Sequence, residues 1–280
     1  MRIDVRKIFV ISILALCIIS INLVVFFQMT DKPLQTEEKE ENEIDAVMLL
    51  ENFSNIFDNQ INYQNNAINV QKKDNTKELI YTNYINQDIK EELYDINVYI
   101  PSFNIDSEEA NKINTEIYSL FYNKVNSILT NNNKYTIYNV KYKAYVNEHI
   151  LSLVIRATLK EGENAQREII KTYNYDLYSN KQLNINNILE YRKLSSQEVQ
   201  KEINRTIEIA SENVKVYSEL GYNKYERNPK DEMYKVENTN VYFMGENKTF
   251  YIIYPYGNTN YTSEIDLLVL WLERGEYCEK

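Results

Sequence analysis

The sequence predicts an α+β protein in which antiparallel sheets, a three-strand meander and a C-terminal meander, pack with two long helices and are preceded by one transmembrane helix. Three observations support this prediction. The chain opens with a long apolar run, two later segments have helical apolar spacing after capping boxes, and two groups of short segments alternate apolar and polar residues. Helices and strands do not alternate regularly, which argues against a parallel βαβ sheet.

The apolar run covers residues 8–27, IFVISILALCIISINLVVFF, and contains no charged residue. A helix of about 20 apolar residues can span a bilayer. Because Arg2, Arg6 and Lys7 precede the run, residues 1–7 are predicted to be a cytoplasmic tail, with the rest of the chain outside the membrane. A cleaved signal peptide is the alternative, but its apolar core is usually about 7 to 15 residues, and no small-residue cleavage site follows. We therefore expect a retained single-pass anchor in the cell membrane.

Residues 28–76 are polar and partly acidic, which predicts a solvated stalk. Within the stalk, residues 44–57 carry apolar side chains at helical spacing and predict a short amphipathic helix. This helix is expected to pack on the domain, with a partner protein or the bilayer surface as alternatives. Residues 58–76 are predicted to be a loop or second linker. The folded α+β domain is predicted to cover residues 77–280.

The first half of the domain, residues 77–183, is predicted to contain two strands, a long helix and a three-strand antiparallel meander. Pro101 is expected to end the second strand because it lacks a backbone donor. Asp106-Ser107-Glu108-Glu109 fits a capping box with Asp106 as N-cap. In the meander, one face of each strand is predicted to be buried and the other to face water. The predicted segments are 79–81, 93–100, 106–129, 135–146, 151–159 and 169–177. The apolar stripe of the helix is Ile113, Ile117, Leu120, Phe121, Val125 and Ile128.

The second half, residues 184–280, is predicted to contain a short helix, a long helix, a loop and the C-terminal meander. Ser195-Ser196-Gln197-Glu198 is a second capping box, and Gly221 is predicted to end the helix that it opens. The two halves are expected to form either one large domain or two subdomains. The predicted segments are 185–191, 195–220, 222–237, 241–244, 250–254 and 265–272.

The composition excludes some classes of function. The 280-residue chain has a formal net charge of -10, so we do not expect it to bind nucleic acid, whose phosphates attract clustered Lys and Arg side chains. An acidic exterior suits a cationic partner instead. Cys17 lies in the apolar run and Cys278 near the C-terminus, so no intrachain disulfide is expected.

Three segments carry a resemblance to a known family. They are Val98-Tyr99-Ile100-Pro101 before the first helix, Ser152-Leu153-Val154-Ile155 in the meander, and Tyr173-Asn174-Tyr175-Asp176-Leu177-Tyr178-Ser179-Asn180-Lys181-Gln182-Leu183. In this order the chain resembles the RsiV/PdaC-type extracytoplasmic domain family, catalogued as the domain of unknown function families 4163 and 3298. The resemblance covers roughly residue 93 to the C-terminus. It implies a membrane-anchored, outward-facing α+β binding module at the cell wall.

The chain also departs from the family. The family commonly carries a Gly-Gly-Ala-His segment where this chain has Gly162-Glu163-Asn164-Ala165, so the histidine is missing. Near the end, Tyr254-Pro255-Tyr256-Gly257-Asn258 keeps the residue types of the family's tyrosine and proline segment but adds a glycine turn. Residues 1–7 are too few for a sigma-binding domain, so an anti-sigma role is not expected.

We predict that the chain is not an enzyme and holds no metal or cofactor. Metal-assisted hydrolysis and nucleophile–histidine catalysis both need a suitably placed histidine. The one histidine, His149, lies at a predicted hairpin turn and is interpreted as a surface residue rather than a base. Glycosidase chemistry needs two carboxylates at a fixed separation. The candidates, interpreted mainly as solvated charges, are Glu161, Glu163, Asp176, Glu264 and Asp266.

The chain contains 25 tyrosines, and several gather near the C-terminus beside Gly257 and Asn260. Tyrosine with asparagine and glycine is typical of adaptable binding surfaces. The predicted binding residues are Tyr254, Tyr256, Asn258 and Tyr261. Packing of these rings in an edge strand is the alternative, and codon bias alone would also explain the tyrosine count.

Together, the sequence and the resemblance predict a single-pass, membrane-anchored extracytoplasmic binding or sensory module of the bacterial cell envelope. The expected ligand is peptidoglycan or a cationic wall hydrolase such as lysozyme. A structural or assembly protein of the envelope is the first alternative. A carboxylate-based cell-wall hydrolase is the second.

Overall fold

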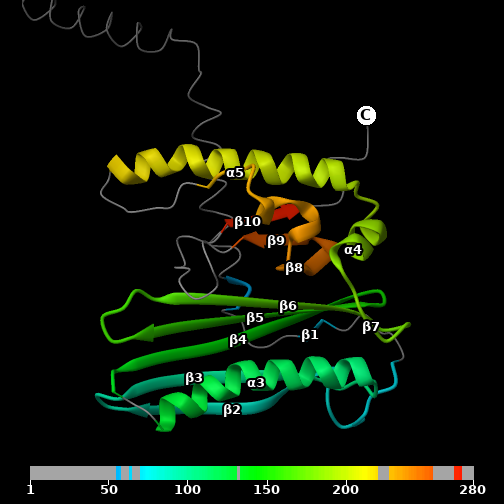
Figure 1. Cartoon of the computed structure of the whole chain (residues 1–280). Coiled ribbons are helices and arrows are strands. Elements are labelled where there is room, and N and C mark those ends of the chain that lie inside the picture. Colours follow the sequence, from blue (N-terminus) through cyan, green and yellow to red (C-terminus); the bar gives the residue numbers. More distant parts are fainter. Residues whose placement is uncertain are drawn as a thin grey trace, which may run out of the picture. The chain divides into compact units, whose positions relative to one another are not determined.

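Two β-sheets pack against each other, and helices cover the outer face of each sheet (Figure 1). The computed structural model describes residues 55–57, 63–64, 70–130, 133–219, 227–254 and 268–272. All of them belong to one unit, Val47–Lys280. The predicted anchor, residues 8–27, lies outside the described residues. Within the described ranges, no helix is both long enough and apolar enough to cross a bilayer.

The larger sheet has seven strands in the order β2-β3-β4-β5-β6-β7, with β1 pairing to β4 beside this path. The predicted meander is confirmed, because β4, β5 and β6 pair antiparallel. By contrast, β3 and β4 run parallel, since the helix α3 crosses between them. The strands are β1 (Tyr63–Gln64), β2 (Ile80–Lys90), β3 (Tyr94–Phe103), β4 (Thr136–Asn147), β5 (Ile150–Glu161), β6 (Arg167–Asp176) and β7 (Lys181–Gln182).

Two predictions about strands are wrong. Pro101 does not end β3, which continues to Phe103. The missing N–H is tolerated because β3 pairs with β4 only as far as Val98, and β2 bulges between Thr82 and Tyr84, opposite this part of β3. The predicted loop at residues 58–76 contributes β1 to the sheet, a strand of only two residues.

The helix α3 (Glu108–Thr130) covers one face of the larger sheet with a nearly complete apolar stripe. The predicted N-cap is wrong by one residue, because the Ser107 hydroxyl accepts the hydrogen bond from the Ala110 N–H at 3.0 Å. Leu120 is also wrong as a core residue, since it is 39% exposed. It lies one residue before the buried Phe121, and therefore about 100° around the helix from it.

The smaller sheet has three antiparallel strands in the order β10-β9-β8, which confirms the predicted C-terminal meander. The strands are β8 (Tyr242–Met244), β9 (Phe250–Tyr254) and β10 (Leu268–Leu272). Its outer face is covered by the helices α4 (Ile185–Arg192) and α5 (Ser196–Glu219). The second capping box is confirmed: the Glu198 N–H donates to the Ser195 hydroxyl at 3.1 Å, and the Ser195 N–H donates to the Glu198 carboxylate at 3.2 Å.

Three apolar clusters result from this stacking. One lies between α3 and the larger sheet, and another between the smaller sheet and the helices α4 and α5. The third lies between the two sheets and includes Tyr145, Val154 and Phe243. Phe57, from the end of the predicted amphipathic helix, is buried in this third cluster.

A row of polar side chains on the larger sheet hydrogen-bonds to the backbone of β8. The Ser152 hydroxyl accepts from the Met244 N–H at 3.1 Å and donates to the Asn174 side-chain oxygen at 2.6 Å. The Asn174 amide then donates to the Tyr242 carbonyl at 2.9 Å. These positions were expected to face water, but Ser152 and Asn174 are buried. The expectation fails because the second sheet covers this face of the meander.

We predict that Ser152→Ala lowers the free energy of unfolding by about 1–3 kcal/mol, because it leaves two buried groups without their hydrogen-bond partner. Denaturant titration of the chain, followed by circular dichroism, measures this change. Ser119→Ala, on the exposed side of α3, is the matched control and should change the value by less than about 0.5 kcal/mol. Equal stability of the two variants would contradict the structural role of the polar row.

Candidate functional site

Four segments from three regions of the chain meet at one end of the larger sheet. They are the turn between β4 and β5, the turn after β6, the helix α4, and a short turn η3 (Glu246–Lys248). Each contributes at least one side chain to what we call the turn cluster. The turn cluster consists of Glu148, His149, Tyr178, Tyr191 and Lys248.

An aromatic stack forms the exposed part of the turn cluster. The His149 and Tyr178 rings are stacked, with centroids 4.9 Å apart and an interplanar angle of 10°. The Tyr191 ring packs edge-on against His149, with centroids 5.5 Å apart and an interplanar angle of 85°. Tyr178 is 72% exposed, more than any other large hydrophobic residue whose exposure the structure describes. A ring held this way presents a flat aromatic surface to solvent.

The backbone fixes the position of Tyr178. The Leu177 N–H donates to the His149 carbonyl at 2.8 Å and joins the two turns. The Asp176 carboxylate accepts from the Tyr178 N–H at 2.8 Å, and its second oxygen accepts from the Ser179 hydroxyl at 2.9 Å. Asn180 adopts the left-handed conformation, with φ of 56°, that such a turn needs. Residues 177–180 therefore form a turn directly after β6, and this turn exposes Tyr178 to solvent.

An ion pair between Glu148 and Lys248 borders the aromatic stack. The hydrogen bond from Lys248 lowers the pKa of the Glu148 carboxyl, and the Tyr191 hydroxyl lowers it further. The same carboxylate raises the pKa of the Lys248 ammonium, which also lies 5.6 Å from the centre of the Tyr191 ring. Burial raises the pKa of the Tyr191 hydroxyl, with Glu148 as the second cause. The turn cluster thus combines an aromatic surface with one fixed carboxylate and one fixed ammonium.

His149 lies in a hairpin turn, as the sequence predicts, but the sequence does not indicate the rest of the turn cluster. Tyr178 lies within the segment at residues 173–183 that carries the family resemblance but is not one of the predicted binding residues, and nothing in the local pattern of Tyr191 or Lys248 indicates a site. Only the tertiary structure brings these two residues together with His149.

Of the predicted binding residues, the structure describes Tyr254, which is buried rather than presented on the surface. Its hydroxyl forms a 2.8 Å hydrogen bond with the Thr239 hydroxyl, and burial raises its pKa to about 12. The buried Arg227 donates to the Tyr254 carbonyl at 3.1 Å and fixes the end of β9. Tyr256, Asn258 and Tyr261 lie outside the described residues, and the binding loop stays a prediction.

The described carboxylates were also candidates for hydrolysis. Glu161 is paired with Lys124 at 2.7 Å and Arg167 at 3.3 Å, and the Lys124 hydrogen bond lowers its pKa. Asp176 pairs with Ile150 at the opposite end of β5 from Glu161. At about 3.3 Å per residue these two carboxylates are roughly 35 Å apart, whereas glycosidases need about 5 to 9.5 Å.

Glu163 lies exposed in the turn after β5, and Glu264 and Asp266 lie outside the described residues. In the part of the chain that the structure describes, no three His, Cys, Asp or Glu side chains gather in a way that could hold a metal ion.

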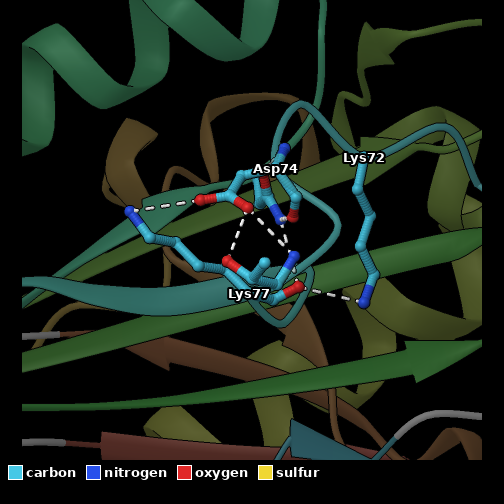
Figure 2. Close-up of polar contacts among 5 residues, drawn as sticks. Lys72, Asp74 and Lys77 are labelled. Carbon is cyan, nitrogen blue, oxygen red and sulfur yellow. Dashed lines mark hydrogen bonds and ion pairs between the residues drawn. The ribbon is translucent and has the colours of Figure 1, made fainter.

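A second polar cluster precedes β2, and its residues form hydrogen bonds and an ion pair with one another (Figure 2). The Lys72 ammonium donates to the Lys77 carbonyl at 3.0 Å, while the Lys77 ammonium lies 3.7 Å from the Asp74 carboxylate. The buried Asn104 side chain donates to the Asp74 carbonyl at 2.7 Å and accepts from the Asp74 N–H at 2.9 Å. These bonds fix the loop to Asn104, directly after β3, and we interpret the cluster as structural.

No family model and no curated protein match the sequence. Among solved structures, the chain is similar to a DUF3298 family protein (PA4972) from Pseudomonas aeruginosa PAO1, with 10% identity and a TM-score of 0.38 over 70% of this chain and 88% of that chain. It is also similar to a DUF3298 family member (BF2082) from Bacteroides fragilis NCTC 9343, with 11% identity and a TM-score of 0.30 over 64% and 81% of the two chains. Both carry the name of one family that the sequence resembles. The resemblance to family 4163 and to the RsiV and PdaC modules stays a prediction.

We predict that Lys248→Met shifts the pKa of Glu148 upward, because the hydrogen bond that lowers it is lost. Carbon-detected NMR of the carboxyl group measures the shift, and Lys230→Met is the control, because Lys230 lies on an exposed turn before the short helix η1 (Glu232–Tyr234). A lowered folded-state pKa adds stability above the ordinary pKa of glutamate, which is lost as the pH falls through the folded value. The variant should therefore lose less stability on acidification. An unchanged Glu148 pKa would show that the ion pair does not form.

Proposed function

We propose that the chain is a single-pass, membrane-anchored binding module of the bacterial cell envelope, and that its turn cluster binds the glycan of peptidoglycan. The observation that carries the proposal is the exposed Tyr178 ring stacked on His149. The apolar C–H faces of sugar rings pack on aromatic side chains, which supply contact area at low entropic cost.

The charges beside the stack support this class of ligand. Glu148 accepts hydrogen bonds and Lys248 donates them, so sugar hydroxyl and acetamido groups find partners of both kinds. The turn cluster also lies on turns fixed by strands and by cross-turn hydrogen bonds, which limits the entropy lost on binding.

A cationic wall hydrolase such as lysozyme is the second candidate ligand. The formal net charge of -10 favours it, because long-range attraction raises the association rate of oppositely charged proteins. This attraction weakens as salt is added, whereas stacking of a sugar on Tyr178 does not depend on net charge.

We predict that Tyr178→Ala weakens binding of the full chain to purified peptidoglycan by about tenfold, the effect of losing one central aromatic contact. Co-sedimentation with peptidoglycan, with the protein in detergent, measures the affinity. Tyr135→Ala is the matched control, because Tyr135 is 41% exposed at the other end of β4. The proposal fails if wild-type protein does not sediment, or if both variants bind equally well. Salt-sensitive capture of lysozyme without peptidoglycan binding would favour the second ligand.

We further predict that a membrane-impermeant maleimide labels Cys278 in intact cells, because the domain is expected to lie outside the membrane. The Cys278→Ser variant should lose the label, which distinguishes it from reaction at Cys17 in the apolar run. Labelling that requires cell lysis, or recovery of the protein from the culture medium, would contradict the anchored topology.

A further inference from the structure

The two edges of the larger sheet differ sharply. At one edge β7 contains only Lys181 and Gln182, and a short edge strand offers little backbone for pairing. At the other edge β2 has 11 residues, and no described strand pairs with its outer side. Alternate residues of such a strand direct their N–H and C=O groups away from the sheet. The outer side of β2 is therefore a long template for another strand.

Proteins usually protect such edges with bulges, charges or proline. In β2 the bulge lies between Thr82 and Tyr84, which leaves Tyr84–Lys90 as a regular stretch. Within that stretch Ile85 is 56% exposed and Ile89 is 70% exposed. The two isoleucines lie four residues apart and so share one face of the strand. A strand edge that remains exposed to solvent would not be expected to carry two exposed isoleucines.

Aromatic side chains border the same edge on the opposite face. Tyr84 meets Tyr118 and Tyr122 of α3 edge-on, with centroids 6.4 Å and 5.1 Å away. Tyr118 and Tyr122 are stacked at 4.6 Å, and Tyr118 is 37% exposed. Both faces of the sheet next to the β2 edge therefore present apolar surface.

The sequence of the regular stretch, Tyr84–Lys90, suits antiparallel pairing with a second copy of the same stretch. Its central residue is Gln87, and antiparallel pairing of two copies about that residue places each Ile85 opposite an Ile89. In the same register Asp88 lies opposite Asn86 and Lys90 opposite Tyr84, so no like charges face each other directly. The one unfavourable pair is formed by the two Asp88 carboxylates, which lie diagonally at about 7–8 Å.

We propose that two copies of this chain associate through antiparallel pairing of their β2 strands, with the two-fold axis at Gln87. The interface is isologous, because the same strand is used by both copies. The axis stands perpendicular to the sheet, so the four isoleucines meet on one face and the two Tyr118 rings approach on the other. This proposal goes beyond the binding function and does not depend on the turn cluster.

Disulfide crosslinking tests the register. In a full chain carrying Cys17→Ser and Cys278→Ser, Gln87→Cys places two sulfurs on residues directly opposite each other, at about 4.5–5.5 Å between Cα atoms, within the range for a disulfide. Asn83→Cys is the matched control, since Asn83 is also exposed on β2. In the proposed register the two Asn83 residues are roughly 26 Å apart. Mild oxidation should give about tenfold more crosslinked dimer for Gln87→Cys.

Two further substitutions in the Gln87→Cys chain test the contacts. Ile89→Lys should reduce the crosslinked fraction. Met233→Lys should not, because Met233 is an exposed apolar residue (39%) outside β2, on the turn η1 (Glu232–Tyr234). Asp88→Asn should increase it by removing the diagonal repulsion. Equal crosslinking at positions 83 and 87 would show a different or non-specific contact and overturn the proposal. No crosslinking at either position would also overturn it, and would leave a strand from another protein as the occupant of the edge.

Discussion

The packing of the two sheets depends on how the backbone N–H and C=O groups at the outer edge of β8 find hydrogen-bond partners. The outer side of β8 faces the larger sheet in a buried region, where an N–H or C=O group without a partner is costly. Side chains of the larger sheet supply the partners: Ser152 and Asn174 bond to the backbone of β8. Nearby, Thr172 accepts from the Tyr242 N–H at 3.1 Å and Asn147 donates to the Gly245 carbonyl at 3.1 Å. Apolar contacts between the sheets tolerate sliding, whereas these directional bonds set one position.

The same bonds position the candidate site. Asn147 ends β4 and holds the Gly245 carbonyl, directly before the turn that carries Lys248. That turn therefore lies where Lys248 reaches Glu148 and the Tyr191 ring. The aromatic stack is placed by a second constraint, the hydrogen bond between Leu177 and His149 across two turns. A surface built from four segments is thereby held by strands, a helix and cross-turn hydrogen bonds, the arrangement that favours binding with little ordering cost.

Three of the described strand edges differ in how their outer backbone groups are placed. The β8 edge is buried and paired by side chains, the β7 edge is short, and the β2 edge is long with exposed isoleucines. The loop of Lys72, Asp74 and Lys77 fixes the residues that lead into β2, so this strand is ordered from its beginning. The β2 edge and the turn cluster differ in the kind of contact that they offer: the edge offers backbone groups beside exposed isoleucines, whereas the turn cluster offers an aromatic surface beside a carboxylate and an ammonium.

The sequence by itself determined the helices, the antiparallel meanders and most of the core, because caps and apolar periods depend on residues within a few positions of each other. The capping box at Ser195 and the stripe from Ile113 to Ile128 are examples. Tertiary structure decided the parallel pairing of β3 with β4, the burial of Ser152, and the meeting of His149 with Tyr178 and Tyr191. The hydrogen bond from Met244 to Ser152 joins residues 92 positions apart. No local sequence pattern indicates such a contact. A serine between apolar neighbours in a strand is predicted to face solvent, and only the packing of a second sheet on that face buries it.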